Sequence, residues 1–346
     1  MIITQREAGL NTPIATNFEK RKNQEQGKTG VTTVAGDGAA GLVDGLASTA
    51  RFKAPLDVAV LSDGTIYVAD GFNSCIRKIS KGIVTTFAGN GHANIKDGNR
   101  FDARFKIPCR LASDVAGNLY LLDAADPRIR KITPAANVST YAGTKTFGFS
   151  DGHVTTAQFG QSFGIAFDGQ QNIYIADSQN DCIRRISAEG RVTTVAGAGA
   201  KKFLNGRIAT SQFHFVKAVV VDKQGNLFVA DLNRIRKVTP EGVISTFIGK
   251  GAEELINGRL RKVRFSEIEG MVMDDQENIY LTEGDRIRKI TPEKIVSTVA
   301  GSVAGYEDGD VASAKFNQPK GLAIDEHRNI YVADFNNNRI RKIRFV

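Results

Sequence analysis

The stretch PKGLAIDEHRNIYVADFNNNRIRKI, residues 319–343, decides the fold because its parts recur along the whole chain. Its last four residues, IRKI, occur six times with small variations, at intervals of 52 to 54 residues. The copies begin at Ile76, Ile129, Ile183, Ile235, Ile287 and Ile340. A period of this length indicates a structural unit that packs against copies of itself.

Three further motifs keep the same phase. A segment like IYVAD ends in an acid in every copy: Asp70, Asp123, Asp177, Asp231, Glu283 and Asp334. A segment like VTTVAG begins at Val31 and recurs five more times. An Asp-Gly or Asn-Gly pair is followed, seven residues after its glycine, by a phenylalanine: Phe52, Phe105, Phe159, Phe213, Phe265 and Phe316.

Each unit contains four short segments of β type. They are an apolar run such as GLAID, the NIYVAD segment, the RIRKI segment and the VSTVAG segment. β-Branched and aromatic residues dominate these segments, and Gly, Asn and Asp fill the joints between them. Four strands per unit, repeated about every 50 residues, predict an all-β, six-bladed β-propeller with four-stranded blades.

The first and last copies of the repeat are incomplete, and each contains strands that the other lacks. The first copy begins with its last strand, residues 31–35, whereas the sixth copy ends on its third strand, residues 339–343. The ring closes if the N-terminal strand completes the last blade, which leaves no unpaired blade edge. We therefore expect a flexible leader over residues 1–29 and a single propeller domain over residues 30–346.

The stretch at residues 319–343 resembles an NHL repeat, and the resemblance covers residues 31–346. The units are longer than a plain NHL repeat, and the excess lies in the connector with the Asp-Gly pair and the phenylalanine, as in some bacterial and plant members. The family includes protein-binding and RNA-binding propellers, sensor ectodomains and, among relatives, amidating lyases and lactonase-like enzymes. The resemblance thus implies the fold and leaves the function open.

Residues present in every copy are interpreted as structural. The acid of the Asp-Gly pair becomes Asn205 and Asn257 in two copies, and Asp and Asn are equivalent as helix caps or turn formers. The phenylalanines are expected to pin the connector onto the sheets as core residues. The acid of the IYVAD segment is expected to brace the turn that follows it.

The basic residues are concentrated in one motif. Lys and Arg number 46 against 37 Asp and Glu, and the formal net charge is +9. The two basic positions of the six IRKI copies account for 12 of the 46, so 34 basic residues remain against 37 acids. Alternation along a strand predicts that each blade turns one basic stem toward each neighbouring blade, with the charged heads at the rim. Charges spread around a circumference make a poor groove for nucleic acid.

Function is expected where the copies differ. The starts of the innermost strands should ring the mouth of the central channel, on the face that also carries the loops after the IYVAD acids. The candidate ligand-binding residues there are Asp57, Arg110, Phe163, Lys217, Glu269 and Lys320. Their asymmetry predicts a non-catalytic interaction scaffold that binds a protein, peptide or glycan at this mouth.

Two other functions stay open at this point. One is a lyase or lactonase-like enzyme in the central channel, and the other is single-stranded RNA binding on the same face. The basic residues around the mouth argue against a bound cation, and His92, His153 and His214 lie at different registers, so we predict no metal, no cofactor and no catalytic residues. Cys75, Cys109 and Cys182 are expected to be free thiols.

The partner and compartment are constrained only weakly. No apolar run reaches the length that a membrane helix needs, so no membrane insertion is expected, and we expect a monomer. Residues 1–30 lack the apolar core and cleavage site of a secretory signal. The compartment therefore stays unassigned, and an extracytoplasmic bacterial location remains open.

Overall fold

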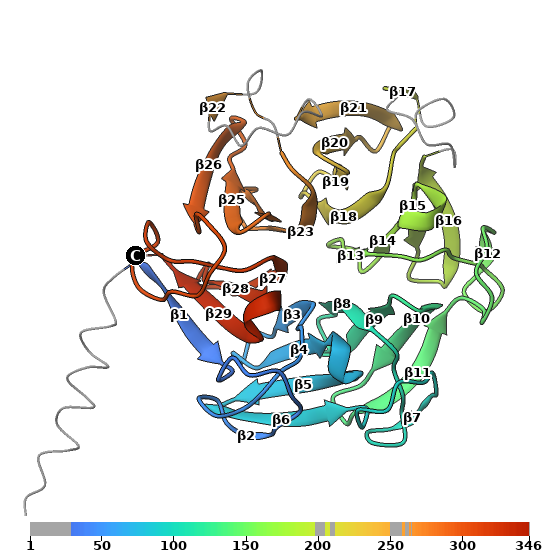
Figure 1. Ribbon diagram of the computed structural model, residues 1–346. Helices are drawn as coiled ribbons and strands as arrows, with labels where there is room; N and C mark the ends of the chain where they lie inside the picture. Colours follow the sequence, from blue (N-terminus) through green and yellow to red (C-terminus); the bar gives the residue numbers. More distant parts are fainter. Residues whose placement is uncertain are drawn as a thin grey trace, which may run out of the picture.

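The fold was analysed in a computed structural model, which describes residues 29–197, 205–207, 212–249, 258, 259, 263 and 265–345. Six small antiparallel sheets surround a central channel (Figure 1). The prediction of an all-β, six-bladed propeller is confirmed. The expected leader lies outside the described residues apart from Thr29.

Each blade is a sheet whose three innermost strands follow chain order outward from the channel. Blade 1 has β3 (Asp57–Val60), β4 (Ile66–Asp70), β5 (Cys75–Ser80), β6 (Ile83–Ala88) and, outermost, β2 (Gly45–Leu46). Blade 2 has β8 (Pro108–Ser113), β9 (Leu119–Asp123), β10 (Asp126–Ile132), β11 (Asn137–Ala142) and β7 (Gly98–Asn99). Blade 3 has β13 (Gly164–Phe167), β14 (Ile173–Asp177), β15 (Cys182–Ile186), β16 (Arg191–Ala196) and β12 (Gly152–His153).

The second half of the ring follows the same plan. Blade 4 has β18 (Val216–Val221), β19 (Leu227–Asp231), β20 (Arg234–Val238), β21 (Val243–Ile248) and β17 (Gly206–Arg207). Blade 5 has β23 (Ile268–Met273), β24 (Ile279–Glu283), β25 (Arg286–Ile290), β26 (Ile295–Ala300) and β22 (Gly258–Arg259). Blade 6 has β27 (Pro319–Ile324), β28 (Ile330–Asp334), β29 (Arg339–Arg344) and β1 (Gly30–Ala35). Short 3₁₀ turns η1 (Gly71–Asn73), η2 (Ser178–Asn180) and η3 (Phe335–Asn337) follow the second strands of blades 1, 3 and 6.

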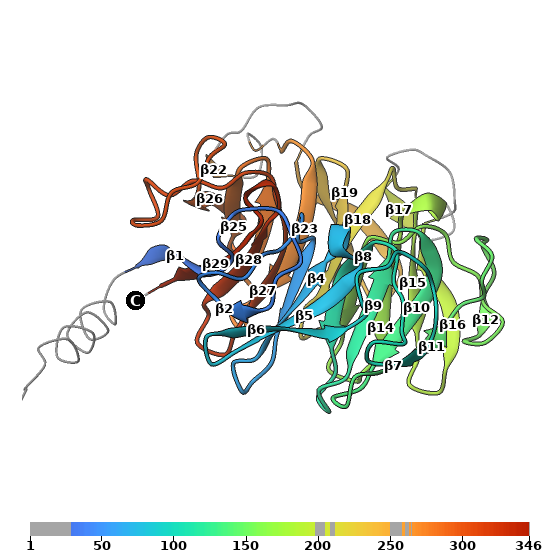
Figure 2. The same ribbon diagram turned by 60° about the horizontal axis from the view of Figure 1, so that its bottom comes forward.

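The first strand of the chain completes the last blade, as predicted. β1 pairs antiparallel with β29, with Val31 opposite Ile343 and Thr33 opposite Arg341 (Figures 1 and 2). Val31 is fully buried in the same cluster as Ile343. The ring is therefore closed by hydrogen bonds between segments from the two ends of the sequence.

Five blades carry a fifth strand that the sequence did not predict. Each is a two-residue strand that begins at the glycine of the Asp-Gly or Asn-Gly pair and adds to the outer edge of the sheet. In blade 6 the corresponding glycine, Gly309, exchanges backbone hydrogen bonds with Val31 at 2.8 and 2.9 Å. The connector of every blade thus covers the outer strand, which would otherwise be an exposed edge.

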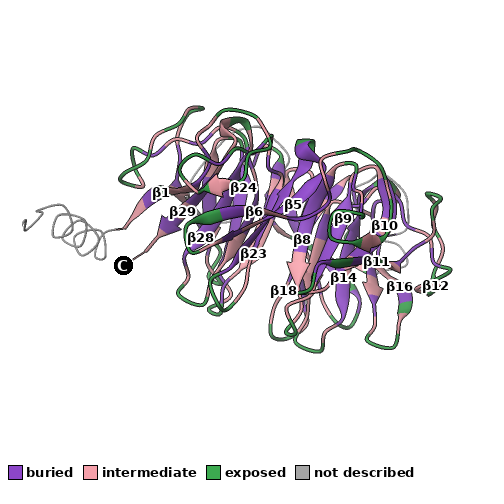
Figure 3. Ribbon diagram, turned by 90° about the horizontal axis from the view of Figure 1, so that it is seen from below, coloured by how far each residue is buried: buried purple, intermediate pink, exposed green. Residues whose placement is uncertain are grey.

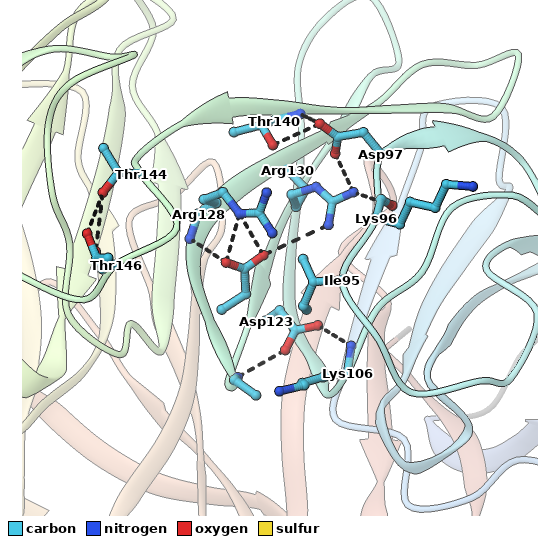
Figure 4. Close-up of polar contacts among 12 residues, drawn as sticks. Ile95, Lys96, Asp97, Lys106, Asp123, Arg128, Arg130, Thr140, Thr144 and Thr146 are labelled. Carbon is cyan, nitrogen blue, oxygen red and sulfur yellow. Dashed lines mark hydrogen bonds and ion pairs between the residues drawn. The ribbon is translucent and has the colours of Figure 1, made fainter.

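The first basic residue of each IRKI copy is buried. Arg77, Arg130, Arg184, Arg236, Arg288 and Arg341 are each 0 or 1% exposed. In blade 2, Arg130 Nη2 lies 2.5 Å from Asp97 Oδ1 (Figure 4). The Arg130 guanidinium lies 5.6 Å from the ring centroid of Phe105. Asp97 Oδ2 also accepts hydrogen bonds from the backbone N–H and hydroxyl of Thr140 at 2.9 Å.

The same unit recurs with a second acid in other blades. In blade 1, Arg77 pairs with Asp44 at 2.5 Å and with the buried Asp70 at 3.0 Å, and it lies 5.2 Å from the Phe52 centroid. Two acids and an aromatic face thus offset the cost of burying one guanidinium. Burial raises the pKa of Asp70 to about 6, although Asn73, the Lys53 N–H and Arg77 all act in the opposite direction.

This layer corrects two expectations. The charged heads of these six arginines do not reach the rim; they lie in the blade interior, between the strands and the connector. The acid of the Asp-Gly pair is structural as expected, but it acts as an ion-pair partner and strand anchor instead of a helix cap. The second basic position, in contrast, is half-buried in every blade. Figure 3 shows the buried strands between two faces of exposed loops.

Candidate functional site

The channel mouth is formed where the innermost strands begin. A Cβ at Gly321 of β27 would overlap the carboxylate of Asp57, and one at Gly270 of β23 would lie 2.6 Å from the Lys320 carbonyl oxygen. Glycine at these two positions allows neighbouring blades to approach closely. Below the mouth, the channel encloses about 280 Å³ and is lined mainly by Val, Ala, Leu, Ile and Met side chains of the six innermost strands.

Three of the predicted site residues form an ion cluster at the mouth. The Glu269 carboxylate lies 3.0 Å from Lys217 Nζ of blade 4 and 2.9 Å from Lys320 Nζ of blade 6. Burial opposes ionisation of Glu269, but the two lysines prevail and hold its pKa below the usual range. Lys217 also pairs with Glu267 at 2.7 Å. The cluster bridges three consecutive blades.

Arg110 crosses the channel. Its side chain leaves β8 of blade 2, and Nη2 donates to the carbonyl oxygen of Glu269 in blade 5 at 2.7 Å. Nη1 donates to the Cys109 carbonyl oxygen at 2.8 Å, and the residue is buried. The Arg110 side chain therefore spans the channel mouth, and its guanidinium is hydrogen-bonded to backbone carbonyl groups of this chain.

Asp57 is the second buried charge at the mouth. Its carboxylate accepts a hydrogen bond from the Leu111 N–H of blade 2 at 2.8 Å. Burial raises its pKa to about 6, and the nearby charge of Arg110 only partly offsets this effect. Among the described residues that line the channel, Asp57 and Arg110 are the ionisable ones.

Aromatic side chains surround the ion cluster. Phe163 lies 6.4 Å from Phe215 between centroids, and Lys217 Nζ lies 5.5 Å from the Phe215 ring. On the other side of the mouth, Phe72 meets Phe335 edge to face at 6.1 Å, and Lys320 Nζ lies 5.5 Å from the Phe335 ring. We call these four phenylalanines and two lysines the aromatic rim.

Sequence reasoning placed Phe163, Lys217 and Lys320 in this rim but missed Phe72, Phe215 and Phe335. Two of the missed residues carried a recognisable signal. Phe72 and Phe335 follow the IYVAD acid within two residues, in the GFN and FNN turns. η1 is held by Asn73, whose side chain donates to Asp70 at 2.8 Å and to the Gly41 carbonyl oxygen at 2.7 Å. The rim thus combines aromatic faces and cations on well-anchored loops.

The family model for the NHL repeat matches residues 52–79 and 316–343 of this chain. These residues contain the second and third strands of blades 1 and 6, and the other four blades repeat their motifs in phase. The predicted resemblance to the NHL-repeat family is confirmed. The NHL propeller is similar in sequence to parts of longer proteins.

Two sequence relatives and one solved structure are representative. The NHL propeller is 29% identical to the protein SUPPRESSOR OF QUENCHING 1, chloroplastic, of Arabidopsis thaliana, over 75% of this chain and 27% of that protein. It is 26% identical to human Teneurin-4, over 87% of this chain and 12% of that protein. The crystal structure of an auxiliary nutrient binding protein from Bacteroides thetaiotaomicron superposes with a TM-score of 0.68 at 17% identity, covering 92% of this chain and 77% of that one.

The chain spans 27% and 12% of the lengths of these two sequence relatives. The fold and the likenesses together support a binding scaffold in general terms. Within the described residues, no group of three or more His, Cys, Asp or Glu side chains converges on a metal position. In the same part of the chain, no helix has the length and apolar character needed to cross a membrane.

Proposed function

We propose that the NHL propeller is a non-catalytic scaffold that binds a protein, peptide or glycan at the aromatic rim of its channel mouth. The observation that carries the proposal is an exposed phenylalanine, Phe72, on an anchored loop beside three half-buried phenylalanines of the rim. Phe72 is 53% exposed although it packs against Phe335. Aromatic residues that stay exposed on rigid loops are typical of binding surfaces.

The charges of the rim support the same proposal. Lys217 and Lys320 share Glu269, and each lies against a phenylalanine ring, so their ammonium groups are already oriented. A ligand would meet pre-organised groups and lose less side-chain entropy on binding. Arg110 and Asp57 lie behind this layer and hold the mouth in shape.

The test is a double variant, Phe72→Ala with Phe335→Ala, and the probes are a displayed random-peptide library and a glycan array. We expect the ligands selected by the wild-type protein to lose binding by at least about tenfold in the variant, because both aromatic anchors are removed. The control is Val115→Ser: Val115 is 90% exposed in the β8–β9 hairpin, at the opposite end of the innermost strand.

Thermal unfolding checks that neither protein has lost its fold. Ligands that bind the double variant and the wild type equally would refute the placement at the rim. Loss of the same ligands in Val115→Ser would instead place the site on the opposite face.

A further inference from the structure

A groove lies between blades 3 and 4, on the face opposite the mouth. The 3/4 groove is lined by Tyr174, Arg185 and Val195 of blade 3 and by Val221, Leu227 and Val238 of blade 4. Its volume is about 830 Å³. The β13–β14 hairpin, at the far end of the innermost strand from Gly164, forms one of its walls.

The neighbouring 4/5 groove has the same construction and provides an internal reference. It is lined by Phe228, Lys237, Phe247, Met273, Ile279 and Ile290, which occupy the equivalent positions. Its volume is only about 210 Å³. Phe247 packs edge to face on Phe228 at 4.8 Å and takes up space that Val195 leaves free in the 3/4 groove.

The basic residue of the 3/4 groove also departs from the repeat. The second basic position of IRKI is lysine in the other five blades, and each of those lysines lies 5.1 to 6.0 Å from an aromatic ring of its own blade. Blade 3 has Arg185 instead, and its Nη2 donates to Asn172 Oδ1 at 2.9 Å. The described residues offer its buried Nε no hydrogen-bond partner.

A buried network holds this guanidinium in place. Asn172 is 4% exposed, and its Nδ2 donates to Asp168 Oδ2 at 2.7 Å. Asp168 also accepts from the N–H groups of Gln170 and Asn172 and from the Tyr174 hydroxyl, so its carboxylate is occupied within the hairpin. Burial, with Asp168 acting in the same direction, raises the pKa of Tyr174, which therefore stays a neutral hydroxyl.

From the open space beside Val195 and the single arginine at the second basic position we infer that the 3/4 groove binds a small carboxylate ligand with an apolar body. The planar fork of Arg185 suits a carboxylate, which can accept two parallel hydrogen bonds. Val195, Val221, Leu227 and Val238 supply the apolar wall, and the size of the groove is typical of small-molecule sites. This site is independent of the aromatic rim.

The inference is tested with N-acetyl-L-phenylalanine as the probe and its amide, which lacks the carboxylate, as the matched ligand. Binding is followed by protein-observed NMR with probe concentrations up to roughly 10 mM. We expect the acid to bind at least about tenfold more tightly than the amide, since only the acid accepts the two hydrogen bonds of Arg185.

Two variants of blade 3 restore the residues that other blades carry. Arg185→Lys should weaken binding of the acid about tenfold and leave the amide unaffected, whereas Val195→Phe should abolish binding of both. Phe247→Val, in the 4/5 groove, is the control and should leave affinity for the acid unchanged. No binding of the acid, equal binding of acid and amide, or equal affinity of Arg185→Lys and wild type for the acid would each overturn the inference, even if Val195→Phe does not fold.

Discussion

The interior of each blade is built from repeated residues, whereas the channel mouth is built from residues that differ between blades. In the interior, every blade buries the same arginine, and in blade 1 Arg77 meets Phe52 and Asp44, an acid that asparagine replaces in blades 4 and 5. At the mouth, the residues differ from blade to blade, and their contacts reach across the ring, as Arg110 does. The repeated unit builds each blade, whereas the divergent residues determine what the assembled ring presents.

The largest effect is expected where the ring closes. Removal of residues 1–36 deletes β1, leaves the outer edge of β29 unpaired and exposes Ile343, at a cost on the order of 5 kcal/mol from the lost hydrogen bonds and apolar burial. Removal of residues 1–28 keeps β1 and should leave denaturant unfolding unchanged. If the two truncated proteins unfold at the same denaturant concentration, the pairing of β1 with β29 does not stabilise the fold as the structure indicates.

The next effect compares two adjacent residues of one strand. Arg77→Met leaves the buried Asp70 without its cation and should cost about 3 to 5 kcal/mol. Lys78→Met removes only a partly exposed ammonium 6.0 Å from the Tyr67 ring and should cost less than about 1 kcal/mol. Equilibrium unfolding in urea measures the free energy of unfolding of both variants. Similar losses in the two variants would contradict the difference in burial between the first and second basic positions.

The mouth has its own structural requirement at Gly321. Gly321→Ala forces a methyl group onto the Asp57 carboxylate and should cost about 3 kcal/mol through overpacking. Gly169→Ala, where a Cβ meets no atom within 4 Å, should change stability by less than about 0.5 kcal/mol. Thermal unfolding of the two variants gives the comparison. A mouth that accepts alanine at Gly321 without loss would be looser than the structure shows.

The smallest effect concerns the charge of Asp57. Burial raises the pKa of Asp57 from 3.8 to about 6 in the folded protein. Between these two pH values the folded state therefore keeps a proton on Asp57, whereas the unfolded state has released it. Wild-type stability relative to Asp57→Asn should therefore fall, by on the order of 2 kcal/mol, as the pH rises from about 4 to about 7. Urea unfolding at the two pH values measures this change.

Asp63→Asn provides the contrast for that experiment. Thr65 holds the pKa of Asp63 below its usual value through two hydrogen bonds. The stability of the wild type relative to Asp63→Asn should therefore be greatest at neutral pH and should be lost as the pH falls below the ordinary pKa of an aspartate. This pH dependence is opposite in direction to the one expected for Asp57. A pH-independent difference for Asp57→Asn would contradict the assignment of a buried carboxylate.

The fold could be predicted from the sequence because every repeat contains the same four strand signals, and the ends of the chain complement each other. The burial of Arg77 and its counterparts could not be predicted from alternation alone. Alternation assigns Arg77 and Lys78 to opposite faces of the strand, and both faces of a blade meet a neighbour. A signal was nevertheless present, since the first basic position is arginine in all six copies while the second varies.

The composition of the mouth could be predicted, but its pairing could not. Divergence among the copies pointed to Lys217, Glu269 and Lys320, and these residues do meet. The hydrogen bond from Arg110 to Glu269 joins blades 2 and 5, and the two residues are 159 positions apart in the sequence. Such a contact depends on the diameter and closure of the ring, which no local pattern specifies.

The pairing of Gly30 with Arg344 has a geometric consequence for attachment. Polypeptide joined before Gly30 and polypeptide joined after Phe345 would leave the disc at one position on its circumference, beside blade 6. Two appended modules would therefore be brought together at a single hub.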